Sequence, residues 1–219
     1  MTAPLTDAEL LRAWRSADAE AGNELVRRHF MSIYRFFVNK VGSADEVDDL
    51  LQRTFLACVE GRDRVRDEGS LRGYLLGIAR NQMLVYVRRR QRDRRSEGTT
   101  DVSVAELSGS PSQVVAGHEE EKLLLIALRE IPLELQTVLE LYYWEELSVA
   151  QMAEVLEIPA GTVKSRLFRA RDALRERLAA MDVPASIRST AVDGFERWAR
   201  SLRDAIAREP GPEREPRSK

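Results

Sequence analysis

The stretch that most constrains this chain is Leu147 to Leu178, which reads as two helices around a tight turn. Ser148 is followed three residues later by Gln151, the spacing of a capping box, so a helix is predicted to begin there. The run from Ile158 to Gly161 breaks that helix, and its proline suits the first turn of the next one. In the second segment, apolar residues recur at helical spacing and predict a single buried stripe, formed by Val163, Leu167, Ala170, Leu174 and Leu178.

The other faces of this second helix are polar and basic. Opposite the apolar stripe, at about 100° per residue, lie Ser165, Phe168, Arg169 and Asp172, with Lys164, Arg166 and Arg171 on the flanks. Phe168 is unusual, because an aromatic side chain that faces away from the core needs a partner. A DNA major groove would supply one, since basic side chains meet phosphate or guanine there and an apolar side chain meets the thymine methyl. The alternative is a surface helix whose phenylalanine packs on a neighbouring element.

Charge along the chain indicates two separate contacts with nucleic acid. The formal net charge is only −2 over 219 residues. Residues 80–95, however, hold seven arginines and one acid, and residues 161–177 hold six basic and two acidic residues. Between them, residues 101–120 hold four acids and neither lysine nor arginine. We therefore expect two basic surfaces on DNA, with the acidic parts facing something else.

The predicted helix-turn-helix also carries a family resemblance. The run GTVKSRLFRAR, residues 161–171, resembles the helix that reads the −35 promoter element in bacterial extracytoplasmic-function sigma factors. Residues 127–148 resemble the first helices of the same C-terminal domain. The resemblance implies that the residues that contact the −35 element are Thr162, Lys164, Ser165, Arg166, Phe168, Arg169 and Arg171.

A helix is predicted over residues 43–61, because Ser43 and Glu46 have capping-box spacing and Gly61 closes the segment. Its apolar face holds Cys58, which is expected to be a small core residue. The opposite side presents Asp49, Gln52, Arg53 and Leu56. From the residues alone, this side is either a protein-binding face or an ordinary solvated one, since single exposed leucines are common.

The same run resembles the sigma-2 helix that binds the clamp helices of the RNA polymerase β′ subunit. The resemblance implies that Asp49, Gln52, Arg53 and Leu56 contact core polymerase. Arg53 is a departure, because the family pattern has an acid at that position. The departure would weaken or redirect this part of the contact.

A long helix is predicted from Leu71 to Arg92, and a cluster of arginines surrounds its C-terminal end. The cluster exceeds what a helix dipole needs, so phosphate contacts are expected. The segment resembles the part of sigma-2 that melts and reads the −10 element. That resemblance implies a pocket for a flipped base lined by Asn81, a closing loop with Arg66 and Ser70, and phosphate contacts from Arg88, Arg89 and Arg90. Without the resemblance, Asn81 would be interpreted as a buried side chain bonded to backbone.

The N-terminal region predicts two more helices, one from the capping pair Thr6 and Glu9 through Trp14, the other from Asn23 to Val41 and ended by Gly42. Residues 96–118 are rich in serine, glycine and acids and predict a flexible linker. Its length, at most about 75 Å when extended, would allow two DNA-reading domains to stand well apart. After residue 181, Phe195, Trp198, Leu202 and Ile206 predict an amphipathic helix followed by a disordered tail.

The predicted fold is therefore all-α, with two small helical domains and an extension. We expect a sigma-2-like domain over residues 5–95, an acidic linker over 96–118, a sigma-4-like helix-turn-helix domain over 119–181 and a C-terminal extension over 182–219. There is no long apolar run, no signal-peptide pattern and only one cysteine, so we expect a cytoplasmic protein without disulfides.

Two classes of function are compatible with this pattern, and a third is not. The resemblance implies a sigma factor that recruits core RNA polymerase to promoter DNA. It would contact the β′ clamp helices and the β subunit and act as a monomer within the holoenzyme. An anti-sigma factor is a further candidate partner. The alternative is a helix-turn-helix regulator with an N-terminal sensing or dimerisation domain, which leaves the arginine cluster beside Asn81 unexplained. A nucleic-acid enzyme is rejected, because the sequence has no metal-ligand set, phosphate-binding glycine loop or nucleophile–base pair, and no cofactor is expected.

Overall fold

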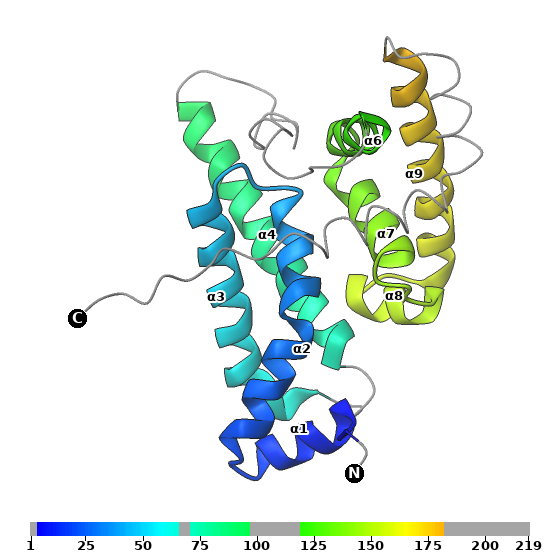
Figure 1. Ribbon diagram of the computed structural model, residues 1–219. Coiled ribbons are helices and arrows are strands. Elements are labelled where there is room, and N and C mark those ends of the chain that lie inside the picture. Colours follow the sequence, from blue (N-terminus) through cyan, green and yellow to red (C-terminus); the bar gives the residue numbers. More distant parts are fainter. Residues whose placement is uncertain (1–3, 66–70, 97–118, 182–219) are drawn as a thin grey trace.

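The computed structural model describes residues 4–65, 71–96 and 119–181, and every regular element within these ranges is a helix (Figure 1). The first bundle consists of α1 (Asp7–Arg15), α2 (Ala19–Val38), α3 (Ala44–Gly61), the 3-10 helix η1 (Arg62–Arg64) and α4 (Leu71–Ser96). The second consists of α6 (Glu119–Glu130), α7 (Leu133–Tyr143), α8 (Val149–Leu156) and α9 (Ala160–Ala180). The all-α prediction is confirmed.

Local capping explains where several helices begin. The backbone N–H of Glu9 donates to Thr6 Oγ1 at 3.3 Å while its carboxylate accepts from the Thr6 N–H at 2.8 Å, which completes the predicted capping box. The box formed by Ser148 and Gln151 is equally complete. Asp18 caps α2 by accepting two backbone N–H groups, so this helix begins at Ala19, before the predicted Asn23.

The predicted end of α2 and the predicted cap of α3 were wrong. Helix α2 ends at Val38 and not at Val41, because the chain turns at Asn39 and carries Lys40 into the protein interior. Ser43 does precede α3, but its side chain makes no cap. Glu46, the expected partner in that cap, instead accepts a hydrogen bond from Tyr86 Oη at 2.9 Å on α4. A tertiary contact has thus replaced the local one.

One continuous cluster of buried apolar side chains extends through both bundles. In the first bundle, the fully buried side chains include Leu11, Leu25, Ile33, Phe37, Leu75, Leu76 and Met83. Cys58 is buried there as predicted, and burial raises the pKa of its thiol to about 11. Val85 of α4 is 53% exposed. In the second bundle, the whole predicted stripe of α9 is buried against α6, α7 and α8.

The two bundles lie side by side and touch, with α8 against α4 (Figure 1). Helix α4 continues to Ser96, past the predicted end at Arg92 and one residue into the expected linker. The rest of that segment and the expected C-terminal helix lie outside the described residues. Within the described part of the chain, no helix is long and apolar enough to cross a membrane.

Candidate nucleic-acid interface

The turn between α8 and α9 is tight and locally specified. Glu157 ends α8 in the left-handed conformation, with φ of 55°, and the backbone N–H of Ile158 returns to the carbonyl of Ala153 at 3.1 Å. Pro159 then precedes the first residue of α9, where its fixed φ suits a helix start. This arrangement sets α9 across α8 as the second helix of a helix-turn-helix.

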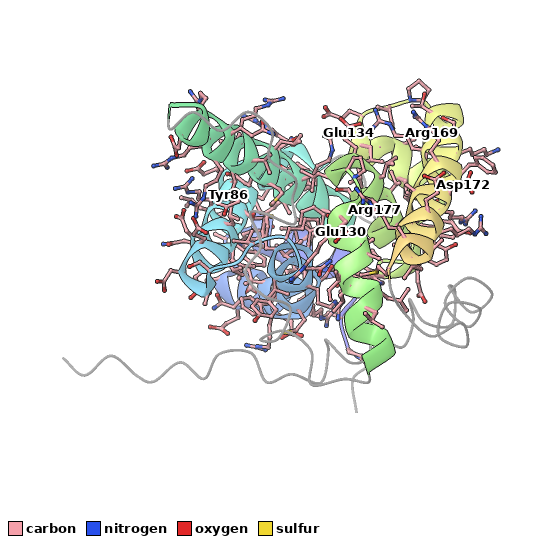
Figure 2. All side chains as sticks on the ribbon, turned by 90° about the horizontal axis from the view of Figure 1, so that it is seen from above. Tyr86, Glu130, Glu134, Arg169, Asp172 and Arg177 are labelled. Carbon is pink, nitrogen blue, oxygen red and sulfur yellow. The ribbon has the colours of Figure 1, made fainter. Side chains whose placement is uncertain are left out.

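The outward face of α9 is the one that the sequence predicted. Lys164, Ser165 and Arg169 are exposed, and Phe168 is 65% exposed although it is aromatic. Ser165 Oγ donates to the Thr162 carbonyl at 3.0 Å, which leaves its own lone pairs accessible. In Figure 2, Arg169 points outward from the side of α9 that faces away from the first bundle. These residues form a free surface with charged, polar and apolar groups.

Two predicted DNA contacts from the flanks of α9 also make contacts within the second bundle. Arg166 Nη2 lies 3.3 Å from a carboxylate oxygen of Glu134 on α7. Arg171 Nε donates to Tyr143 Oη at 2.8 Å, and its guanidinium lies 5.5 Å from the ring centroids of both Tyr142 and Tyr143. Both arginines therefore help to orient α9 on α7.

On α4, Asn81 is exposed, so the buried alternative for this residue is excluded. It lines a cleft together with Tyr74, whose hydroxyl donates to the Gly61 carbonyl at 3.1 Å. The opposite wall belongs to the second bundle and is formed by Glu154, Val155 and Glu157. Arg66 and Ser70, predicted to close over a base at this position, lie outside the described residues.

The basic end of α4 is only partly free. Arg88 and Arg89 are exposed, whereas Arg90 forms an ion pair with Glu46 of α3. Tyr86 donates to the same carboxylate, and the Arg90 guanidinium carbon lies 5.7 Å from its ring centroid. Tyr86 and Arg169 lie on opposite sides of the molecule (Figure 2). The two basic surfaces thus belong to different bundles and face apart.

The outer side of α3 forms a third surface. Asp49, Gln52, Arg53 and Leu56 are all exposed, with Leu56 at 56%. Arg53 Nη2 lies 2.8 Å from a carboxylate oxygen of Asp49 one turn earlier. The basic residue that departs from the family pattern is therefore paired within its own helix, beside an exposed leucine and an exposed amide.

Sequence reasoning missed a group of buried polar residues between the bundles. Glu140 of α7 is 2% exposed and forms an ion pair with Lys40, which is fully buried. Lys40 also donates to the Phe36 carbonyl at 2.7 Å. Glu140 accepts two further hydrogen bonds, from Asn39 Nδ2 at 3.2 Å and Gln136 Nε2 at 3.3 Å.

A second acid lies beside the first. Glu145, just after α7, is 4% exposed and accepts from Ser32 Oγ at 2.5 Å and from Arg72 Nε at 3.0 Å. Arg35 Nη2 is 3.7 Å from its other oxygen. These partners stand between 73 and 113 residues away in the chain, so no local pattern could have identified them.

Comparison with known proteins is consistent with this division of the chain. A family model for Sigma-70 region 2 matches residues 25–93, and one for Sigma-70, region 4 matches residues 122–174. The ECF RNA polymerase sigma factor SigL of Mycobacterium tuberculosis is 32% identical over 161 residues, which cover 73% of this chain and 90% of SigL. The ECF RNA polymerase sigma factor SigW of Bacillus subtilis is 28% identical over 172 residues, 75% and 92% of the two chains.

Among solved structures, the sigma factor RpoE in complex with the anti-sigma factor NepR from Bartonella quintana has a similar fold. The TM-score is 0.58 at 22% sequence identity. The match covers 72% of this chain and 96% of the RpoE chain.

Proposed function

This chain belongs to the extracytoplasmic-function sigma factors of the sigma-70 family, and from that premise we propose which of its surfaces carries each step of initiation. As an RNA polymerase sigma factor it binds core polymerase and promoter DNA and directs promoter recognition and melting. The regulator alternative is not favoured, because both sigma regions match in the expected order. We assign residues 5–95 to core and −10 binding and residues 119–181 to −35 binding.

The −35 element is read by the outward face of α9. Ser165 and Arg169 offer hydrogen-bonding groups to base edges, and Phe168 offers an apolar contact for a thymine methyl. Lys164 is placed for phosphate. Thr162, Arg166 and Arg171 belong to the same site, and we assign the two arginines to the DNA backbone because their guanidinium groups are already held by α7. The observation that carries this assignment is the exposed aromatic ring.

The −10 element is read by the cleft on α4. Asn81 is exposed there and offers both a donor and an acceptor to an unstacked base, and Arg66 and Ser70 complete the site. The arginines at the end of α4, Arg88 and Arg89 with Arg90, hold the phosphates of the melted strand.

Core polymerase is bound by the outer side of α3, where Leu56 is exposed beside Asp49, Gln52 and Arg53. We propose the β′ clamp helices as the partner of this face and the β subunit as a further polymerase contact. An anti-sigma factor is included among the proposed partners, since the structural neighbour is bound to one. The site of action is the cytoplasm, where the polymerase is.

The decisive experiment is a pull-down with core polymerase followed by run-off transcription on genomic fragments. The double variant Gln52→Ala with Leu56→Ala should lose most of its core affinity and keep its melting temperature, since both side chains are exposed. Asn23→Ala, an exposed change on α2, serves as the control and should alter neither. A melting temperature several degrees lower with unchanged core affinity would place these two residues in the fold and not in an interface.

A further inference from the structure

The last turn of α1 binds the backbone that follows α3. Arg15 donates from Nε and Nη2 to the Arg62 carbonyl, at 3.3 and 3.0 Å, and from Nη2 to the Val65 carbonyl at 2.7 Å. These two acceptors are the first residue of η1 and the residue that follows it. Carbonyl groups at a helix end lack partners within the helix, and the planar guanidinium supplies donors for both. Arg15 therefore fixes both ends of the segment 62–65.

Two aromatic side chains reinforce this contact. The Arg62 guanidinium carbon lies 5.7 Å from the ring centroid of Trp14, next to Arg15 on α1. Tyr74 of α4 donates to the Gly61 carbonyl at 3.1 Å, and a Cβ added to Gly61 would overlap the Tyr74 hydroxyl oxygen. Glycine at this position permits the close approach. Both α1 and α4 thus hold the start of the segment 62–65.

The segment that is held in this way carries Arg64 at the −10 cleft. Arg64 and Val65 line the same cleft as Asn81 and Tyr74. Val65 is 4% exposed and anchors the segment, whereas Arg64 is exposed. Burial raises the pKa of the Tyr74 hydroxyl, and the positive charge of Arg64 acts in the opposite direction. Within the described ranges the Arg64 guanidinium forms no ion pair, so its charge is available to a ligand.

We propose that Arg64 binds a phosphate of the unstacked −10 strand and that Arg15 is the positioning residue that holds Arg64 at the cleft. The proposal rests on the −10 assignment of Asn81 above. Arg15 is not among the described residues that line the cleft, so it acts through the segment 62–65 and not on DNA. The match to Sigma-70 region 2 begins at residue 25, after α1, so the family comparison does not account for this contact.

The chemistry of Arg15 suits a positioning role. Its guanidinium is a rigid fork that can bond two carbonyls at once, whereas a lysine ammonium is a point charge on a flexible stem. A phosphate contact made from a fixed backbone requires less ordering on binding than one made from a mobile turn. Asp63, the acid next to Arg64, lies 4.0 Å from Arg15 Nε, which partly offsets its charge. Arg15 is only partly buried, so water can replace its donors and a variant there keeps its fold.

A scan with neutral phosphates tests the Arg64 contact. The probe is a promoter fragment recovered by the run-off experiment and melted across the −10 element, with a methylphosphonate in place of one non-template phosphate at a time. Holoenzyme with the wild-type chain should lose about 10-fold in affinity at the phosphate that Arg64 binds, as expected for one charge-assisted hydrogen bond. Arg64→Gln should bind the unmodified probe about 10-fold more weakly and show no further loss at that phosphate. It should also reduce the salt dependence of log K by about 0.7.

The role of Arg15 is tested with the same scan. Arg15→Gln should weaken binding of the unmodified probe several-fold and reduce the loss at the Arg64 phosphate only, and it should have no further effect in a chain that also carries Arg64→Gln. Arg15→Lys keeps the charge without the fork and should behave as Arg15→Gln. Arg28→Gln is the matched control, because Arg28 donates to the Leu5 carbonyl at 2.7 Å beside the other end of α1, and its side chain is 30% exposed against 28% for Arg15. The control should leave the scan unchanged.

Three results would overturn the proposal. A scan that Arg64→Gln leaves unchanged would remove Arg64 from the DNA. An equal loss from Arg15→Gln with and without Arg64→Gln would make Arg15 a residue of the fold only, and full affinity of Arg15→Lys would assign its effect to charge and not to the fork. Failure of the −10 assignment is distinguishable, because Asn81→Ala would then leave promoter opening on duplex DNA unimpaired, whatever the scan shows.

Discussion

Phe168 offers the sharpest test of the −35 surface, because its side chain has no evident structural task. The ring is 65% exposed on α9. Full burial of a phenylalanine side chain contributes about 1.5–3 kcal/mol, so covering the exposed two thirds on DNA would contribute about 1–2 kcal/mol. At about 1.4 kcal/mol per factor of ten, Phe168→Ala should weaken binding of a −35 duplex about 5- to 30-fold.

The assay is a titration of labelled −35 duplex with reconstituted holoenzyme, at one fixed salt concentration. A second duplex with deoxyuridine for thymidine removes only the methyl groups. If Phe168 contacts a thymine methyl, the wild-type protein should bind the deoxyuridine duplex more weakly, and the Phe168→Ala variant should bind both duplexes equally. The melting temperature of the variant should stay within about 2 °C of the wild type, as is usual for surface changes.

Two results would contradict a contact between Phe168 and a thymine methyl. A loss of several degrees in melting temperature with unchanged affinity would mean that the ring packs within the protein. A loss of affinity that is the same on both duplexes would leave Phe168 on the DNA but away from the thymine methyl.

Other exposed and buried side chains give further predictions. Lys164→Ala should weaken DNA binding on all sequences and reduce the salt dependence of log K by about 1. Arg169→Ala should weaken the free energy of DNA binding by roughly 1–3 kcal/mol and relax the preference at one base pair. Identical salt and sequence profiles for the two variants would contradict this division. Asn81→Ala should impair promoter opening and be rescued on a template already melted at that position, because extruding a base costs a few kcal/mol; equal defects on both templates would indicate a structural residue. Burial raises the pKa of the Cys58 thiol from 9.0 to about 11, so its thiolate at pH 8 is roughly 100-fold scarcer than in the unfolded chain. The rate of Cys58 alkylation should therefore follow the rate of unfolding. Fast labelling of the native protein would contradict the burial of Cys58. Because this pKa is raised on folding, the thiol's contribution to stability should be intact below pH 9 and decline as the pH rises toward 11.

Features that depend on residues three or four positions apart could be predicted from the amino-acid sequence. The capping boxes at Thr6 and Ser148, and the apolar stripe that ends at Leu178, depend on spacings of three and four residues, which a single helix expresses without help. The exposed face with Phe168 followed from the same periodicity. The exposure of these positions on α9 was therefore predictable, whereas the contacts of Arg166 and Arg171 with α7 were not.

Side chains whose partners lie far along the chain could be placed only from the folded arrangement of the helices. Lys40 follows a helix and would be expected in water, yet it is fully buried against Glu140, 100 residues later. Glu46 has the spacing of a capping residue, but its carboxylate binds Tyr86 and Arg90 of α4 instead. A charge can be buried only where a partner offsets its desolvation, and that partner exists only once the two bundles have met.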